Sequence, residues 1–224
     1  MTEIVEMKWE KNIILKGKIK VITGLHIGGG NDSVKIGGTD NPVAKTLMVK
    51  DGKTFEIPYI PGSSIKGKMR RVLFNYLSTT QNEEYNNAIK DLFGTASKEN
   101  DSGTISRMVF RDCYPTKETL DLFRNNELTE VKAENWISED MKATPRFIER
   151  IRPFTEFDFE CVISIYKGDD ESVFLYLFEE GIKLIQQSYL GGNGTRGYGK
   201  ILVEYNINNR KEKYLKDYEK EAKL

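Results

Sequence analysis

The residues most capable of chemistry gather in one glycine-rich stretch near the N-terminus. Residues 24–43, GLHIGGGNDSVKIGGTDNPV, contain the only histidine of the chain, His26, and two aspartates, Asp32 and Asp40. Glycine allows close approaches of the backbone that side chains would block, and long loops in compact domains are usually functional or disordered. The stretch is therefore a candidate site, although a lone histidine such as His26 is more often a packed structural residue.

A second group combines two hydroxyls with several cations at the start of an expected helix. GSSIKGK, residues 62–68, fits the start of the phosphate-binding P-loop pattern, but Met69 stands where Ser or Thr must hold magnesium. Gly67 also falls inside the helix rather than before it, which excludes a nucleotide hydrolase of this class. A basic helix N-terminus still attracts phosphate, through Ser63, Ser64, Lys66, Lys68 and Arg70. A capped helix with a solvated basic face explains the pattern about as well.

A third group is a glycine-rich turn near the C-terminus. GNGTRG, residues 192–197, fits the pattern G-x-G-x-x-G, but it follows an expected helix and precedes a strand, the wrong order for a Rossmann fold. Its glycines still allow close approach of another backbone. A sugar-phosphate chain could lie against Gly191, Gly192, Gly194 and Arg196, although a tight structural turn is at least as good an interpretation.

The elements that must position these groups follow from the hydrophobic periodicity. Residues 13–23 alternate as a half-buried strand, with apolar side chains on one side and lysines on the other. Residues 61–77 show helical spacing, with Ser63 or Ser64 as the expected N-cap. The further expected elements are strands at 106–114 and 157–166, a helix at 171–190 and a strand at 200–207. This order, β-α-β followed by β-α-β, predicts an α+β fold with a ferredoxin-like core.

Three segments do not fit this minimal core, namely residues 24–58, 93–105 and 124–153. We expect a single domain, 1–224, that carries them as a long glycine-rich loop, a lid-like loop and a protruding insertion. The tail after residue 207 has mixed charge and weak periodicity, which predicts a solvated helix or a frayed end. Four aromatic residues are expected in the core: Phe147, Phe154, Phe157 and Phe159.

The composition excludes several classes of protein. The 34 basic residues balance the 34 acidic ones, so any nucleic-acid surface must come from local clustering. No apolar run approaches the roughly 20 residues of a membrane span, and the charged start, MTEIVEMKWE, does not fit a signal peptide. Cys113 and Cys161 lie far apart without further cysteines, so we expect no zinc site and reduced thiols in a cytoplasmic protein.

A series of short motifs occurs in an order that resembles the RAMP superfamily. They are TGLHIGGG, IGGTDNPV, IPYIPGSSIKGKMR, LFG, FRD, TEVKAEN, PRFIERI, FDFE and YLGGNGTRGYGK, and the resemblance as a whole runs over residues 13–204. Within the superfamily, GLHIGGG, PGSSIKGKMR and PRFIERI are similar to the repeated backbone subunit of the type III-A (Csm) CRISPR effector complex. The resemblance implies a modified ferredoxin-like core, similar to an RNA-recognition motif, in subunits that stack as a filament along a guide RNA.

The resemblance also implies a reaction. Each subunit of the family projects a β-hairpin thumb that displaces a nucleotide of the guide–target duplex, and the thumb region matches residues 129–151 within the insertion 124–153. A family aspartate then supports cleavage of the target RNA with Mg²⁺ or another divalent cation. Its pattern, G-x-x-D-[SN]-P-V, places it at Asp40 rather than Asp32. After NPV the run AKTLMVKDGKTFEIP departs from the family, so the path of residues 44–56 is open.

Other residues match further family positions. The resemblance assigns guide-RNA contacts to the serines, cations and turn residues named above and to Arg146. It assigns supporting roles, as orienting hydrogen-bond or ion-pair partners, to His26, Asp112, Glu130, Glu134 and Glu149. The implied partners are guide RNA, target RNA, copies of this chain and other subunits of the Csm complex, with no membrane.

Two alternative functions stay open. The first is a non-catalytic scaffold that only binds guide RNA in the same assembly. The second is a stand-alone RAMP endoribonuclease that processes the guide, which would need an acid–base set that one histidine does not supply. A cleavage assay with metal separates the catalytic subunit from the scaffold.

Overall fold

An antiparallel sheet forms the centre of the structure. The structure is a computed structural model, and it describes residues 7–29, 41–50, 52–78, 83–96, 103–123, 127–137 and 143–221. The strands of the sheet run in the order β4-β7-β1-β8, and β9 pairs with the N-terminal half of β1. The strands span Met108–Phe110 (β4), Glu156–Tyr166 (β7), Trp9–Val21 (β1), Ile201–Tyr205 (β8) and Lys211–Tyr214 (β9). The predicted α+β class with an antiparallel sheet is confirmed.

β1 and β7 form the middle of the sheet because their apolar residues alternate in register. Leu15 lies opposite Cys161, and Ile19 lies opposite Phe157. All four side chains are buried, whereas most residues between them are charged. A strand with this period of two buries one face and exposes the other, so the sheet has one apolar face and one open face.

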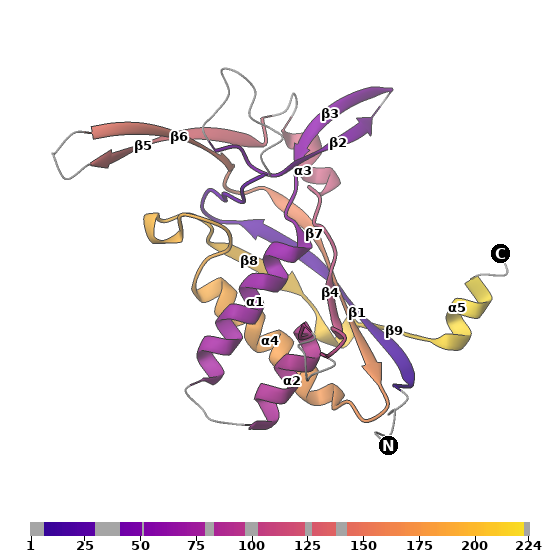
Figure 1. The fold of residues 1–224 in the computed structure, drawn as a ribbon. Helices are drawn as coiled ribbons and strands as arrows, with labels where there is room; N and C mark the ends of the chain where they lie inside the picture. The colour runs from indigo at the N-terminus through magenta and orange to yellow at the C-terminus, as the bar shows by residue number, and fades with distance from the viewer. Residues whose placement is uncertain are drawn as a thin grey trace.

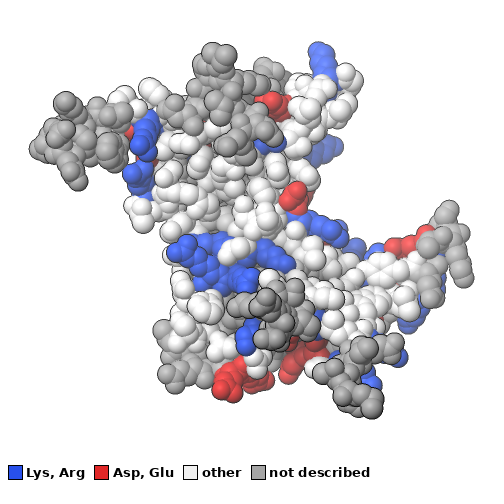
Figure 2. All heavy atoms as spheres, in the orientation of Figure 1, with Lys and Arg blue, Asp and Glu red and all other residues white. Residues whose placement is uncertain are grey.

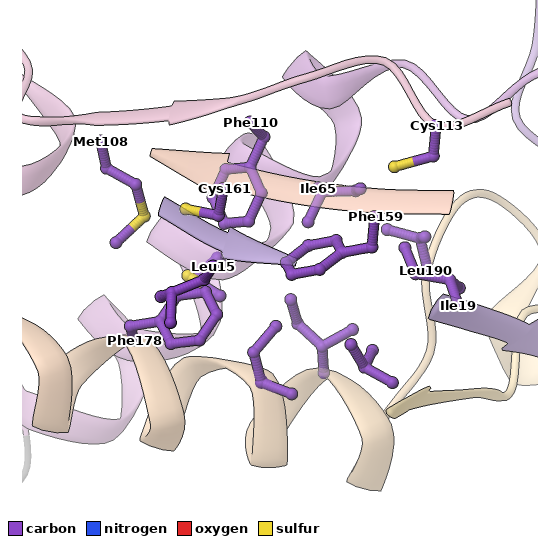
Figure 3. Close-up of a cluster of buried hydrophobic side chains, with 14 of the residues drawn as sticks. Leu15, Ile19, Ile65, Met108, Phe110, Cys113, Phe159, Cys161, Phe178 and Leu190 are labelled. Atoms are coloured by element: carbon purple, nitrogen blue, oxygen red, sulfur yellow. The ribbon is translucent and has the colours of Figure 1, made fainter. Parts of the chain in front are cut away.

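Three helices cover the apolar face (Figure 1): α1 (Gly62–Leu77), α2 (Glu83–Phe93) and α4 (Glu171–Gln187). Figure 3 shows Phe178 of α4 directed toward Phe110 and Phe159 of the strands, with ring centroids 6.5 and 6.3 Å away. Gly181 allows α4 to approach α1 closely, since an added Cβ would lie 2.6 Å from Met69. Burying such side chains contributes roughly 1.5–3 kcal/mol each. This packing fixes α1 on the sheet.

The open face of the sheet carries ion pairs between neighbouring strands. Lys16 of β1 reaches Glu160 of β7 at 2.7 Å, and Lys20 reaches Glu156 at 3.3 Å. Each lysine lies directly opposite its partner in the strand register. Pairs in this position contribute roughly 0.2–1 kcal/mol each. Charge therefore ties the two central strands together on the side that no helix of the apolar layer covers.

Two hairpins extend from one end of the molecule in opposite directions (Figure 1). β2 (Lys45–Lys50) and β3 (Lys53–Pro58) form one of them. β5 (Thr129–Ile137) and β6 (Ala143–Ile151) form the other. The first hairpin takes up the part of the chain whose path the sequence left open.

The three predicted insertions lie around these hairpins. The first hairpin belongs to the insertion 24–58, and the second belongs to the insertion 124–153. Of the lid-like loop 93–105, the described residues are the two ends, where Thr95 and Thr104 exchange backbone hydrogen bonds of 3.1 and 3.3 Å. The boundaries of the insertions and of the single domain stay predictions.

The C-terminal tail contains a strand that the sequence analysis missed. β9 adds to the sheet beside residues 11–14 of β1, and α5 (Leu215–Glu221) follows it. The ring of Tyr218 packs edge-on against Trp9 with centroids 5.9 Å apart, and its hydroxyl accepts a hydrogen bond of 3.0 Å from Asn12. The expected solvated helix exists as α5, but the tail is anchored to β1 and not frayed at β9.

The starts and ends of several elements differ from the predictions. Neither Ser63 nor Ser64 is an N-cap, because Pro61 precedes α1 without a side-chain cap and the Gly62 N–H donates to Asp112 at 2.8 Å. The strand expected over 106–114 is only the short β4. After it the chain bulges at Cys113, which pairs with Ile60, and returns to β7 at Tyr114 and Pro115. α3 (Lys117–Leu122) follows.

Two aromatic residues expected in the core are instead exposed. Phe147 is 49% exposed on β6, and Phe154 is 71% exposed at a turn where its φ is 69°. Phe157 and Phe159 are buried as expected. No described helix is both long and apolar enough to cross a bilayer.

Candidate nucleic-acid interface

The glycine-rich loop that contains Asp32 and Asp40 leaves the described part of the chain and returns to it at one place. Asp32 and Asp40 both lie outside the described residues. On either side of the gap, Gly29 N–H donates to the Pro42 carbonyl at 3.1 Å, and Ala44 N–H donates to the Ile27 carbonyl at 2.8 Å. The two ends of the loop are therefore paired like a short ladder, and this ladder is its base.

The base of the loop is attached to β6 of the second hairpin. Asn41 bridges to Ile148, and its carbonyl accepts a hydrogen bond of 3.2 Å from the Glu149 N–H. The Glu149 carboxylate in turn accepts the Val43 N–H at 3.0 Å. Asn41, directly after Asp40, is thus fixed to the hairpin through its backbone, and Val43 is fixed through the Glu149 side chain.

Glu149 is a buried carboxylate with all its partners inside the protein. Only 6% of the residue is exposed. Lys45 contacts it at 2.6 Å and the Thr129 hydroxyl donates to it at 2.8 Å. Burial alone would raise its pKa, but the hydrogen bonds from Lys45, Val43 and Thr129 hold the pKa below its usual range. The carboxylate joins both hairpins to the loop base and is already neutralised by a cation.

His26 joins the loop base to the glycine-rich turn. Its Nδ1–H donates to the Glu149 carbonyl at 2.7 Å, and its own carbonyl accepts the Gly192 N–H at 2.8 Å. An added Cβ on Gly191 would overlap that carbonyl. The close approach of these two segments explains why a glycine stands at 191. His26 has the contacts of a structural residue.

The acids of β5 pair with cations on both sides. Glu130 contacts Arg150 at 2.7 Å and Arg152 at 3.5 Å. Glu134 contacts Lys132 and Arg196, both at 3.2 Å. The predicted RNA-binding residue Arg196 therefore forms an ion pair with the predicted supporting residue Glu134. Arg146 lies opposite Glu134 in the register of the hairpin.

The cations of α1 divide into two groups. Lys66 donates to the Ser106 hydroxyl at 2.5 Å, and Lys68 lies 3.7 Å above the ring of Tyr189. Burial, with the charges of Arg70 and Arg71 respectively, lowers the pKa of both lysines. Arg70 and Arg71 are exposed, and Figure 2 shows a continuous area of lysine and arginine atoms over α1. The arginines thus form the outward part of the predicted phosphate site.

The N-terminal turn of α1 already has an anionic partner. Asp112 accepts the Gly62 N–H, and the Ser64 N–H donates to the Pro61 carbonyl at 3.0 Å. Ser63 is exposed and Ser64 is half-buried. Asp112 also lines a hollow of about 420 Å³ together with residues of β1 and β7. A phosphate here would approach the helix from its exposed side, past Ser63.

No set of three or more acids, histidines or cysteines within the described ranges could hold a metal ion. Glu130, Glu134 and Glu149 are each paired with a cation, which makes them poor ligands. Asp40 therefore remains the candidate metal-binding residue that the sequence resemblance names.

Some residues of this region were missed by the sequence analysis. The buried ring of Tyr198 lies between Lys132, at 4.8 Å, and Arg150, at 5.0 Å. Lys45 neutralises Glu149. Tyr198 lies close after the motif residue Arg196, and this closeness in sequence could have pointed to Tyr198 as part of the site. Lys45 is far from Glu149 in sequence, and no pattern links the two.

Comparison with known proteins identifies the family. The model of the RAMP superfamily matches residues 18–202. The chain is 38% identical over 215 residues to the protein named CRISPR system Cms endoribonuclease Csm3 of Methanothermobacter thermautotrophicus, covering 87% of this chain and 84% of that protein. A Streptococcus thermophilus protein of the same name is 37% identical over 199 residues, covering 86% and 87%.

Solved structures agree with this relationship. A Csm3–Csm4 subcomplex of the type III-A CRISPR-Cas interference complex includes a chain that matches with a TM-score of 0.51 and 26% identity over 97% of this chain and 98% of that one. The crystal structure of Methanopyrus kandleri Csm3 has the same fold, with a TM-score of 0.57 and 19% identity over 88% and 76%. The chain belongs to the RAMP superfamily and, within it, to the Csm3 family.

Proposed function

We propose that this chain is the repeated backbone subunit of a type III-A CRISPR interference complex. In this role it binds guide RNA as a filament and cleaves the complementary target RNA at regular intervals with a divalent cation. The names of its relatives support the endoribonuclease activity. Its partners are guide RNA, target RNA, copies of itself and other Csm subunits in the cytoplasm.

One observation carries the proposal for the reaction. The loop with Asp40 begins and ends at the base of the β5–β6 hairpin, where Glu149 binds Val43 and Asn41 on one side and His26 on the other. Hydrogen-bonded elements therefore anchor both ends of the glycine-rich loop, which is how functional loops are positioned. The hairpin is the natural candidate for the family thumb.

The topology supports the ferredoxin-like interpretation of the core. α1 lies between β1 and β4 in sequence, α4 lies between β7 and β8, and the strands run β4-β7-β1-β8. This is the arrangement expected of two β-α-β halves. The open face of the sheet bears ion pairs where an RNA-recognition motif bears stacking aromatics, so we place the guide on α1 and on the turn around Arg196.

The exposed side of α1 fits an RNA backbone. Arg70 and Arg71 are exposed there, and Gly67 has no heavy atom within 4 Å of the position of an added Cβ. A glycine within a helix costs about 1 kcal/mol relative to alanine, and no contact within the described chain requires it. A backbone that packs directly against Gly67 would explain this residue.

The proposed chemistry uses the substrate's own nucleophile. Once the strand is held in line, the 2′-hydroxyl of a displaced nucleotide can lose its proton to water and attack the adjacent phosphate. The bond from phosphorus to the 5′-oxygen of the next nucleotide then breaks, which leaves a 2′,3′-cyclic phosphate and a 5′-hydroxyl that takes up a proton from water. A divalent cation would neutralise the developing charge, with Asp40 as its protein ligand and with phosphate oxygens and waters completing its coordination. The hairpin and the loop base hold the strand and the loop in position.

Replacing Asp40 tests the proposal. Asp40→Ala should leave assembly and target affinity nearly intact and abolish cleavage, because the carboxylate acts only in the transition state. The assay is a labelled target incubated with assembled complex and magnesium, read as a ladder of regularly spaced products. Chelation of the metal should remove the ladder of the unmodified complex. Asp32→Ala, in the same loop, is the control and should cleave nearly normally.

The same assay decides between the proposal and the scaffold alternative. A complex that binds target RNA but yields no metal-dependent ladder is a scaffold. A ladder that persists with Asp40→Ala, or disappears with Asp32→Ala, would show that Asp40 is the wrong carboxylate.

A further inference from the structure

The β5–β6 hairpin is joined to the body at its base. Leu25 and Ile151 exchange backbone hydrogen bonds of 3.0 and 2.7 Å there. Glu134 lies farther out on β5, about 16 Å from Thr129 at roughly 3.3 Å per residue. Its ion pair with Arg196 therefore ties an outer part of the hairpin to the glycine-rich turn of the body. A contact at this distance from the base has strong leverage on the direction of the hairpin.

Both sides of this ion pair are held in place by their surroundings. Arg196 ends a short 3-10 turn, Gly194–Arg196, flanked by Asn193 and Gly197 with φ of 57° and 84°. An added Cβ on Gly194 would overlap the ring of Tyr189. The turn is thus tightly packed and presents the arginine in a fixed position.

Glu134 is held equally well. Only 13% of its side chain is exposed, and Lys132 occupies its other oxygen at 3.2 Å. Lys132 itself lies over the ring of Tyr198. Burial alone would raise the pKa of Glu134, but the Tyr198 hydroxyl, Lys132 and Arg196 together hold the pKa below its usual range. The carboxylate is charged at neutral pH.

Arg196 can serve a second partner at the same time. Its contact with Glu134 uses one terminal nitrogen, Nη1, and 51% of the side chain is exposed. A guanidinium carries five N–H donors in a rigid planar fork. The remaining donors can bind a phosphate from the solvent side while Nη1 stays with the carboxylate.

We propose that Glu134 is a positioning residue that acts through Arg196, which is shared between the hairpin and a guide-RNA phosphate. This inference rests on the proposed function. The phosphate fixes the guanidinium, and the guanidinium fixes Glu134 and the direction of β5–β6. Guide binding is therefore coupled to the order of the hairpin.

Hydrogen exchange on the full chain, with and without guide RNA, tests this coupling. In the unmodified chain we expect guide RNA to slow amide exchange in residues 129–137 and 143–151. With Glu134→Gln, exchange in these strands of the free chain should rise about two- to fivefold, the size that a partly exposed ion pair contributes. Guide RNA should then slow amide exchange in these strands less than it does in the unmodified chain, while the affinity for guide RNA is not reduced. Glu127→Gln, the same charge change beside the hairpin base, should alter neither.

A charge swap separates the two roles of Arg196. Arg196→Ala should loosen the hairpin and weaken guide binding together. The double variant Glu134→Arg/Arg196→Glu should restore hairpin protection without restoring guide affinity, because the phosphate partner is lost. If Arg196 had a structural role only, these variants would not separate hairpin protection from guide affinity.

Two results would overturn the inference. One is unchanged exchange in the hairpin with Glu134→Gln, which is measurable even if the double variant does not fold. The other is guide-induced protection that persists in full without Glu134. If the unmodified chain did not bind guide RNA, the proposed function would be contradicted instead. Exchange in the RNA-free chain would still report the ion pair, so the two failures can be told apart.

Discussion

At the scale of single residues, Gly67 and Glu149 differ in how far contacts within the chain explain why the residue is there. Glu149 is completely explained by its contacts within the chain, with Lys45, Val43 and Thr129 around one carboxylate. Gly67 has open space where a Cβ would be. A residue that the fold does not require points to something outside the fold.

Gly67→Ala should therefore stabilise the protein and weaken RNA binding. Alanine removes the helix penalty of glycine, so the free energy of unfolding should rise by about 0.5–1 kcal/mol. The added methyl group should reduce guide affinity severalfold if RNA packs there. Urea denaturation and filter binding measure the two effects. Asn75→Ala, also exposed on α1, is the control that should gain stability without losing affinity.

Glu149 makes stability depend on acid pH. Its folded pKa is depressed below the ordinary value of 4.5, so its stabilisation is complete above that value and is lost as the pH falls through the folded pKa. Glu149→Gln should destabilise the protein by about 1–3 kcal/mol at pH 7, since Lys45 loses its counter-charge. The variant should also lose less stability on acidification. Urea unfolding at pH 7 and pH 4 measures both, and equal pH slopes for the two proteins would contradict the assignment.

At the scale of elements, the long periodic segments were predictable and the short or charged ones were not. The helix expected over 61–77 is α1, because its apolar residues repeat at helical spacing. β9, with the sequence KEKY, was missed because an exposed edge strand with lysines has no apolar pattern. β4 is shorter than expected because its ladder with β7 is interrupted at Cys113, which pairs with Ile60, a tertiary contact that local sequence does not encode.

The site divides in the same way. Motifs named Asp40, Arg196 and the acids, but they did not show which distant residue each acid contacts, such as Lys45 for Glu149 or Arg196 for Glu134. The motifs also could not separate the cations of α1 by direction. Lys66 and Lys68 turn toward Ser106 and Tyr189, whereas Arg70 and Arg71 face solvent.

This division of α1 predicts different salt dependence for two double variants. Arg70→Ala/Arg71→Ala should lower the slope of log affinity against log salt by about 1–2, as expected for one or two lost phosphate contacts. Lys66→Ala/Lys68→Ala should change the slope less and destabilise the fold more. Guide binding titrated at several salt concentrations gives the slopes, with Lys90→Ala/Lys183→Ala as the control. A larger change in the salt slope for the lysine variant than for the arginine variant would mean that the lysines make the phosphate contacts.

At the scale of the whole molecule, the C-terminal segment completes the sheet that carries the site. The family model ends at residue 202, yet β9 and α5 beyond it pair with β1 and cover Trp9. β1 is the strand from which the glycine-rich loop departs. The segment therefore supports the strand that leads into the site.

Deleting residues 206–224 should destabilise the protein without removing its RNA surface. Loss of the β9 ladder and of the contacts of Tyr218 should lower the free energy of unfolding by about 2–4 kcal/mol. Guide affinity at a temperature where the protein is folded should remain within about twofold, because α1 and the glycine-rich turn are intact. Thermal unfolding and binding at low temperature measure these effects. An unchanged melting temperature would mean that the tail adds nothing to the fold.

The ion pairs on the open face of the sheet have a consequence for handling the protein. The penalty for removing charges from water falls on heating, whereas concentrated salt screens exposed charges. The ion pairs of this face should therefore be weakened less by moderate warming than by concentrated salt. Molar salt is also the means of stripping RNA from a basic surface. The salt that frees the subunit of nucleic acid would therefore also weaken the ion pairs Lys16–Glu160 and Lys20–Glu156, which join β1 and β7, and the salt should be lowered again once the RNA is removed.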